Sequence, residues 1–323
     1  MSFFQIMNND PETLINDKWI LSLRGKKNIP DPGKPYALLV EKELTRSGNT
    51  EDIAVIFLTN RECPFHCLMC DLWKNTTDEI LPEGMIPDQI YYALKQIPDV
   101  KHIKLYNSGS FFDPGAVPVK DYKSIAELLR RFETVIVESH PRFVDEKCLQ
   151  FRDLLVPELQ IAMGLETINP EVLEYLNKRM TTDQFRQAVE FLSSNGIRSR
   201  SFILLKPPFM TETEGIFWAE RSADFSFDCG TDCCTIIPVR AGNGAMEELI
   251  RKGHFSPPGI KSLEKALESG IRLGKGRVFA DLWDLRLFSD CDKCYDDRYK
   301  RLTEMNHSQK IPKEVECSCN NLQ

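Results

Sequence analysis

Residues 53–73 read IAVIFLTNRECPFHCLMCDLW. The first seven residues are apolar or β-branched, and they have the length and composition of a buried β-strand. A polar segment follows immediately and carries Cys63, Cys67 and Cys70. A strand that runs directly into such a segment predicts that the three thiols lie on a loop at the C-terminal end of that strand.

Downstream, short apolar runs alternate with amphipathic segments of helical length. Strands are predicted at residues 53–59, 102–106, 134–137, 159–164, 201–205 and 235–239, and helices at 88–97, 121–132, 146–155, 182–194, 214–227 and 261–273. Alternation repeated about six times predicts right-handed βαβ crossovers and a parallel sheet. We therefore expect an α/β fold, a partial (βα)6 TIM-like barrel, with its chemistry on loops at the C-terminal ends of the strands.

Composition divides the 323 residues into three predicted parts. Residues 1–50 include a Pro- and Gly-rich stretch at 28–35 and are expected to form an N-terminal extension. Residues 51–284 contain the alternating pattern and are expected to form the core domain. Residues 285–323 are polar and cysteine-bearing, and too few of them are apolar for an independent core. We expect this part to be a small metal-binding tail.

Charge and hydropathy exclude several classes of protein. The chain has 41 Lys and Arg against 48 Asp and Glu, a formal net charge of −7. This balance argues against a broad nucleic-acid surface, and hence against direct tRNA binding. No apolar run has the length of a membrane span, and the N-terminus does not read as a secretory signal, so we expect a cytoplasmic protein without a membrane partner. Eleven cysteines without an export signal favour metal ligation over disulfides.

The first three cysteines have the spacing Cys-x3-Cys-x2-Cys. Thiolates are the natural ligands of iron–sulfur clusters, and three of them on one loop would leave the fourth iron of a four-iron cluster open to a small molecule. The alternative is a zinc knuckle completed by His66 or by a distant cysteine. Zinc motifs usually come as two cysteine pairs, and His66 lies inside the triplet, where it is poorly placed to complete a tetrahedron.

This motif, in its position after the first strand of a (βα)6-type pattern, resembles the radical S-adenosylmethionine (SAM) superfamily. The resemblance implies that Cys63, Cys67 and Cys70 ligate a [4Fe-4S] cluster whose open iron binds SAM. It further implies that reduction cleaves SAM to methionine and a 5′-deoxyadenosyl radical, which abstracts hydrogen from a small-molecule, peptide or modified-nucleoside substrate. A one-electron donor such as flavodoxin or ferredoxin would supply the electron.

The same resemblance implies roles for residues near the cluster. Met69 precedes the last cysteine, where the family contacts the adenine of SAM. Asn107, Ser108, Gly109 and Ser110 follow the second strand, where the family presents a Gly-rich turn to the methionine amino group.

Charged and apolar residues at the remaining strand ends are further candidates for cofactor binding. Glu138 and Glu166 end the third and fourth strands, where a carboxylate can bind ribose hydroxyls or an ammonium group, or form a salt bridge in the barrel mouth. The turn at residues 164–167 resembles that of the tRNA methylthiotransferases and the Elongator catalytic subunit. Lys206 and Arg240 could bind an anionic group or pair with a carboxylate. Ile237 could pack on the adenine.

The tail carries Cys291, Cys294, Cys317 and Cys319 as two close pairs. Four thiolates complete either a closed zinc site or a second iron–sulfur cluster. The resemblance favours an auxiliary [4Fe-4S] cluster over zinc. The four remaining cysteines are expected to be ordinary thiols: Cys148, Cys229, Cys233 and Cys234.

Two alternative functions remain open. The stretches 59–63, 70–73, 106–111 and 206–209 resemble the radical subunit that forms archaeosine in tRNA, which implies a tRNA-modifying enzyme. In a different class, the chain would be a non-catalytic zinc or iron–sulfur protein that keeps its metals and does not cleave SAM.

Overall fold

One curled sheet of eight strands organises the part of the chain that the computed structural model describes, residues 15–321. The strands lie side by side in chain order: β1 (Ala37–Leu44), β2 (Thr50–Phe57), β3 (His102–Tyr106), β4 (Thr134–Glu138), β5 (Glu158–Glu166), β6 (Arg198–Leu205), β7 (Cys233–Pro238) and β8 (Arg277–Ala280). The β1–β2 pair is antiparallel, and every later pair is parallel. The predicted α/β fold with a partial barrel is confirmed.

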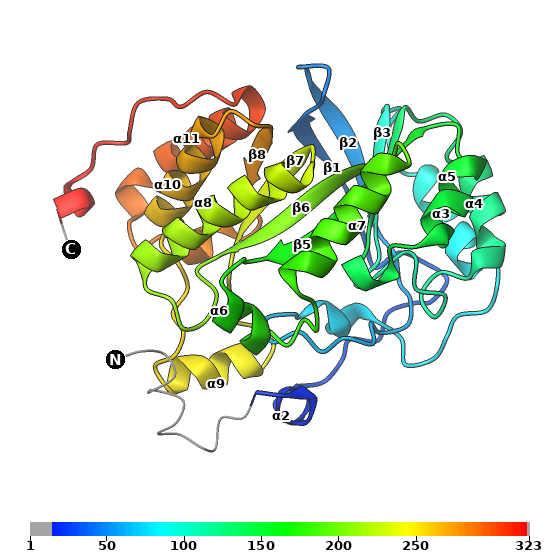
Figure 1. Cartoon of the computed structure of the whole chain (residues 1–323), viewed down its shortest axis with the longest axis horizontal. Coiled ribbons are helices and arrows are strands. Elements are labelled where there is room, and N and C mark those ends of the chain that lie inside the picture. Colours follow the sequence, from blue (N-terminus) through cyan, green and yellow to red (C-terminus); the bar gives the residue numbers. More distant parts are fainter. Residues whose placement is uncertain (1–14, 322–323) are drawn as a thin grey trace.

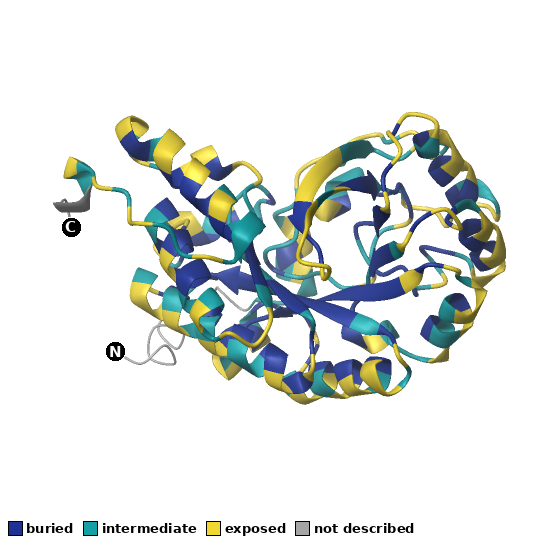
Figure 2. Cartoon of the chain, turned by 90° about the horizontal axis from the view of Figure 1, so that it is seen from above, coloured by how far each residue is buried: buried dark blue, intermediate teal, exposed yellow. Residues whose placement is uncertain are grey.

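Helices cover the outer side of this sheet (Figures 1 and 2). The crossover helices are α3 (Met85–Leu94), α4 (Tyr122–Leu128), α5 (Glu146–Leu154), α7 (Thr182–Ser194), α8 (Glu212–Cys229) and α10 (Ile260–Arg272). Shorter helices are α2 (Asp17–Ser22), α6 (Pro170–Tyr175) and α9 (Ala245–Arg251), and α11 (Asp292–Ser308) lies in the C-terminal part. Figure 2 shows the amphipathic pattern, because the helices bury one side and expose the other.

The segments that flank the predicted core add elements that were not predicted. Residues 37–44 of the N-terminal extension form β1, which extends the sheet along β2. In the tail, α11 places Leu302 and Met305 in a core shared with α8, α10, β7 and β8. The boundaries at residues 50 and 284 stay predictions, but both flanking segments contribute elements that pack on the barrel.

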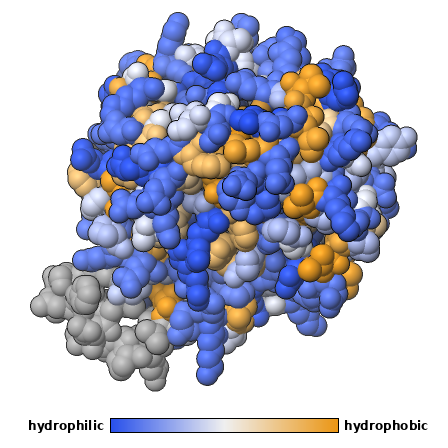
Figure 3. Space-filling view, turned by 45° about the vertical axis from the view of Figure 1, so that its right-hand side comes forward, coloured by the Kyte–Doolittle hydropathy of each residue, from blue (hydrophilic) through white to orange (hydrophobic). Residues whose placement is uncertain are grey.

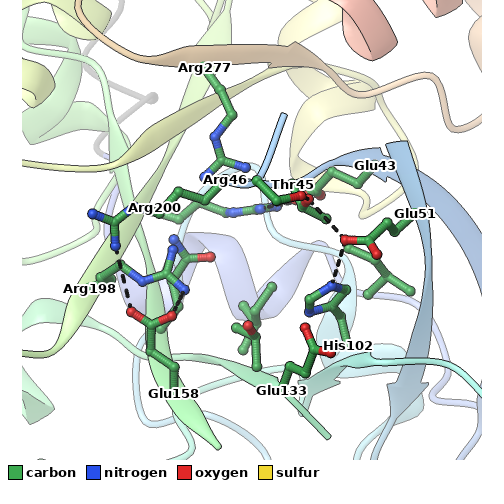
Figure 4. A pocket seen from close by; sticks show the side chains of 15 residues that line it. Glu43, Thr45, Arg46, Glu51, His102, Glu133, Glu158, Arg198, Arg200 and Arg277 are labelled. Carbon is green, nitrogen blue, oxygen red and sulfur yellow. Dashed lines mark hydrogen bonds and ion pairs between the residues drawn. The ribbon is translucent and has the colours of Figure 1, made fainter. Parts of the chain in front are cut away.

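The N-terminal ends of the parallel strands surround a small pocket of charged side chains (Figure 4). Glu158 pairs with Arg198 at 2.5 Å, and buried Glu43 accepts hydrogen bonds from Lys104 at 2.6 Å and Arg200 at 2.8 Å. Burial alone would raise the pKa of Glu43, but the charges of Arg200 and Lys104 hold it well below its usual range. Arg198 and Arg200, the densest basic stretch of the core, are therefore used in internal pairs rather than on a nucleic-acid surface.

The surface is polar where Figure 3 shows it, with apolar side chains in small scattered groups. Among residues 15–321, no helix combines the length and apolarity of a membrane-spanning segment.

Candidate active site

The cysteine loop leaves β2 at the C-terminal end of the strand and is held by amide side chains from two distant loops. Asn243, which follows β7, donates through Nδ2 to the backbone oxygens of Leu68 at 2.6 Å and Cys70 at 3.2 Å. Asn177, which follows α6, donates through Nδ2 to the backbone oxygen of His66 at 2.8 Å. These bonds fix the backbone that carries the three thiols, as ligand loops require.

The three thiols are largely enclosed by protein. Burial raises the pKa of Cys63, Cys67 and Cys70 to about 12 each. The nearby charge of Lys178 opposes this rise at Cys63 and Cys67 without cancelling it. A partly buried set of three soft sulfur donors with a cation beside it suits a cluster that converts the thiols to thiolates on binding.

His66 is not positioned as a zinc ligand. Its Nδ1 lies 3.3 Å from Asp17 Oδ2 and its Nε2 lies 3.9 Å from Glu62 Oε1, so both ring nitrogens face carboxylates. The described residues therefore offer no support for a knuckle completed by His66.

The turn after β3 lies directly against the first cysteine. A side chain at Gly109 would place its Cβ 3.3 Å from the Cβ of Cys63, so the backbone approaches the cysteine loop closely at this point. Asn107 is fully buried, and neither its Nδ2 nor its Oδ1 has a hydrogen-bond partner. A buried amide without partners is costly unless a polar ligand binds it. This is the observation that best marks a ligand position beside the cysteines.

The other predicted residues of this turn have structural contacts. Ser110 Oγ accepts a hydrogen bond from the backbone N–H of His140 at 2.8 Å. Ser108 adopts a φ of 52° and its Oγ lies 3.0 Å from the hydroxyl of Tyr36. Tyr36 immediately precedes β1, so the predicted extension reaches the candidate site.

Glu138 holds the turn from the neighbouring strand. Its Oε1 accepts a hydrogen bond from the backbone N–H of Asn107 at 2.6 Å. Burial raises the pKa of Glu138 to about 7, and the backbone N–H groups of Asn107, Gly109 and Ser108 limit that rise. The carboxylate is therefore used to position the turn, and we propose that it acts on SAM only through that turn.

Glu138 is expected to make stability fall as pH rises. Its carboxyl stays protonated up to about pH 7 in the folded chain but loses its proton near 4.5 when unfolded, so the folded state binds more protons between these values. As the pH rises across this window, the free energy of unfolding of the native chain should fall by up to about 3 kcal/mol relative to that of the Glu138→Gln variant. Urea unfolding at several pH values measures the difference. Exposed Glu133→Gln is the control, and parallel pH profiles for the native chain and Glu138→Gln would contradict the assignment.

Glu166 forms a buried ion pair beside the cysteines. Its Oε1 lies 2.7 Å from the Nζ of Lys178, and both side chains are 8% exposed. Glu166 adopts a φ of 65° at a bulge in β5. A Cβ at Gly164 would lie 2.1 Å from Glu166 Oε1 and 2.6 Å from Lys178 Nζ, so only glycine leaves room for the pair. Of the two interpretations of Glu166, the salt bridge is the one observed in the structure.

The two predicted cations lie in different surroundings. Lys206 is buried and donates to Glu212 at 2.7 Å and Ser256 at 2.8 Å, which is the carboxylate pairing considered from the sequence. Arg240 is half-exposed, 3.3 Å from Asp284 and 3.8 Å from Asp71, the residue after Cys70. Arg240 thus lies at the edge of the cysteine loop, whereas Lys206 is engaged at the start of α8.

Met69 and Ile237 meet in one apolar cluster. Both are partly buried against a core that includes Leu68, Leu204 and Val239. Both predicted adenine contacts therefore border the same apolar cluster.

The tail thiols also come together. The Sγ atoms of Cys291, Cys294, Cys317 and Cys319 all lie within 4.8 Å of one another. The other four cysteines are buried, as expected of ordinary thiols: Cys148, Cys229, Cys233 and Cys234.

Comparison with known proteins identifies the family. The model of the radical SAM superfamily matches residues 57–214, which run from the last residue of β2 to the first turn of α8 and include the cysteine loop. Residues 57–214 are a radical SAM domain. With this domain, the chain is a radical SAM enzyme. Such a domain implies a [4Fe-4S] cluster and SAM as cofactors.

Three relatives of this radical SAM enzyme come from archaea. It is 28% identical to an uncharacterized protein of Methanocaldococcus jannaschii, over 92% of this chain and 88% of the relative. It is 26% identical to archaeosine synthase subunit beta of Methanosarcina acetivorans, over 78% of this chain and 76% of that protein. The match to archaeosine synthase subunit beta of Thermococcus kodakarensis, also at 26% identity, covers 62% of this chain and 65% of that protein.

Solved structures share the fold of the radical SAM enzyme. Elp3 of Methanocaldococcus infernus superposes with a TM-score of 0.52 at 14% identity, over 70% of this chain and 59% of that chain. SuiB of Streptococcus suis gives a TM-score of 0.50 at 12% identity, over 82% of this chain and 53% of that chain.

Several residues at the site of this radical SAM enzyme were not predicted from the sequence. They are Tyr36, Asn177, Lys178 and Asn243, and they reach the cysteine loop or its adjoining turn from three separate segments. Each is an isolated polar residue without motif spacing. The pair Asn177-Lys178 after a helix was the available signal, but it is common in ordinary turns.

Proposed function

We propose that Cys63, Cys67 and Cys70 hold a [4Fe-4S] cluster and that SAM binds at its open iron, next to the turn at Asn107. The fully buried amide of Asn107, which has no partner and lies beside a turn packed on Cys63, carries this proposal. When bound and reduced, the cluster would supply the electron that splits SAM into methionine and the 5′-deoxyadenosyl radical that takes a hydrogen atom from the substrate.

The chain's own residues would bind and orient the two cofactors. The amide of Asn107 offers one donor group and one acceptor to the amino-acid part of SAM, and Ser108 and Gly109 offer backbone groups nearby. Met69 and Ile237 present an apolar surface for the adenine. These assignments rest on the shared position of these residues around the cysteine loop.

Lys178 would offset negative charge at the cluster. Its ammonium is buried, already paired with Glu166, and close enough to Cys63 and Cys67 to oppose the rise in pKa that burial causes at both thiols. Three thiolates in a low-dielectric site repel one another, so a fixed cation beside two of them stabilises the ligated form.

We propose a modified nucleoside as the substrate class, ahead of a peptide or another small molecule. The support is the similarity to two proteins named archaeosine synthase subunit beta. The match to the protein of Methanosarcina acetivorans covers 76% of that protein. A tRNA-modifying enzyme of the archaeosine type is the second candidate on the same observation. The chain has a net charge of −7, and Arg198 and Arg200 pair with carboxylates inside the protein. Both observations argue against binding of the tRNA phosphate backbone by this chain alone.

Cleavage of SAM tests the proposed function. Anaerobically purified protein, reconstituted with iron and sulfide and reduced with dithionite, should convert SAM to 5′-deoxyadenosine, measured by liquid chromatography and mass spectrometry. Unreduced protein is the control. Reduced protein with a full complement of iron and no 5′-deoxyadenosine would instead support the non-catalytic iron–sulfur protein.

Substrate class is tested by the rate of the same reaction. A modified nucleoside as substrate should raise 5′-deoxyadenosine formation about tenfold or more when unfractionated archaeal nucleosides are added. An equal rise with intact tRNA, and none with free nucleosides, would favour the archaeosine-type candidate. No change with either would contradict both.

A further inference from the structure

Four cysteine thiols from the two ends of the C-terminal segment meet at one point. Cys291 and Cys294 lie at the start of α11, whereas Cys317 and Cys319 lie at the short 3-10 helix η5 (Ser318–Asn321). The Sγ atoms of Cys291 and Cys317 are 3.8 Å apart, and those of Cys294 and Cys319 are 3.6 Å apart. All four lie within 4.8 Å of one another.

These distances discriminate between the two metals that the cysteine pattern allows. A tetrahedral zinc ion with bonds of about 2.3 Å places its sulfur ligands about 3.8 Å apart. A four-iron cluster binds each thiolate at a different corner and holds the sulfurs at roughly 6 Å. The observed spacing matches the first value. We propose that Cys291, Cys294, Cys317 and Cys319 hold one zinc ion and not an auxiliary iron–sulfur cluster.

The cysteine loop of the barrel makes an informative contrast within the same molecule. Among the described residues, the tail tetrad is the group whose ligand atoms come close enough together to share a single ion. Cys63, Cys67 and Cys70 do not form such a group, as expected for ligands at three corners of a larger cluster. The two cysteine sets therefore differ in geometry as well as in number.

Donors and cations around the tetrad suit four thiolates. The backbone N–H of Cys294 donates to the sulfur of Cys291, and that of Cys319 donates to the sulfur of Cys317. Arg298 Nε donates to Cys294 Sγ at 3.3 Å, and Lys261 Nζ donates to the backbone oxygen of Cys319 at 2.7 Å. Four thiolates and Zn²⁺ leave two negative charges, and Arg298, which also pairs with Glu264, and Lys261 place positive charge beside them.

The site is structural rather than catalytic. Four protein thiolates fill a tetrahedral ion completely and leave no position for substrate or water. Residues 309–317 have neither helix nor strand, and Arg301 binds the backbone oxygens of Pro312 and Lys313 at 2.9 Å each. Zinc would anchor the end of this segment on α11, which is itself packed on the barrel core. This inference does not depend on the proposed function.

Metal analysis of the full chain separates the two sites. The Cys63→Ala/Cys67→Ala/Cys70→Ala variant, after exposure to both zinc and iron with sulfide, should bind about one zinc ion and no iron. The Cys317→Ser/Cys319→Ser variant should lose the zinc and keep about four irons. Cys229→Ser is the matched control, because this thiol lies away from both sites. Four irons retained in the triple variant, or no metal there at all, would overturn the inference.

Cobalt gives a second, spectroscopic measurement of the tail site in the triple variant. Co²⁺ added to the metal-free triple variant should produce the intense visible absorption of tetrahedral cobalt thiolate, and added zinc should remove it. Weak octahedral bands, or no spectrum with the native tail cysteines present, would count against a four-thiolate site.

Discussion

Replacing Cys63, Cys67 or Cys70 by alanine is expected to abolish the formation of 5′-deoxyadenosine by reduced protein. Each change removes one of three thiolates proposed to hold the cluster, and the loop offers no other thiol in its place. The loss should exceed about 1,000-fold, because only the cluster supplies the electron for the reaction. Each reconstituted variant is assayed for iron content and for 5′-deoxyadenosine under the same anaerobic conditions.

The matched control is Cys229→Ala. This buried thiol lies at the end of α8, near the N-terminal end of β7 and therefore away from the barrel mouth. Its variant should keep both iron content and cleavage. Persistent cleavage in any variant of the triplet would show that the cluster lies elsewhere. Loss of activity in the control as well would point to a general effect of removing buried thiols.

Replacing Lys178 by methionine is expected to cost about 3–5 kcal/mol of folding free energy. The change keeps the length of the side chain but leaves the buried carboxylate of Glu166 without its partner at 2.7 Å. Urea unfolding of the metal-free protein measures the loss. The double variant Lys178→Met/Glu166→Gln should recover part of it, because the unpaired charge is then absent.

A second readout distinguishes a structural pair from a role at the cluster. If Lys178 offsets the charge of the thiolates, the double variant should bind the cluster more weakly than the native chain even where its stability is restored. Lys206→Met is the control, since Lys206 is a buried lysine that pairs with Glu212 and does not contact the cysteine loop. Equal iron retention in the double variant and the native chain would limit Lys178 to stabilising the fold.

Helices and strands whose ends are set by nearby residues could be predicted from the sequence. The predicted helix at 182–194 is α7 itself, because Thr181 and Gln184 form a capping box and Gly196 ends the turn with a φ of 69°. The run at 102–106 is likewise β3, a strand whose first four residues are buried in the sheet. Such boundaries depend on residues close together in the chain.

Elements that depend on distant partners were missed. β8 has four residues and is recognisable mainly by its pairing with β7. β1 contains Glu41, Lys42 and Glu43, and its polar sequence does not show that Glu43 is buried against Lys104 and Arg200. A charged residue inside a barrel is stable only where its partner arrives from another strand, so a single-segment pattern cannot indicate it.

By itself, the sequence determined the family and the candidate cluster ligands, because Cys63, Cys67 and Cys70 lie within eight residues and follow a recognisable strand. It also indicated that the four tail cysteines form a metal site, but it did not distinguish zinc from iron. Only the tertiary structure decided which charges meet at the barrel mouth and how far apart the tail sulfurs lie. Ligand identity depends on distances between atoms, and those distances are set where segments far apart in the chain pack together.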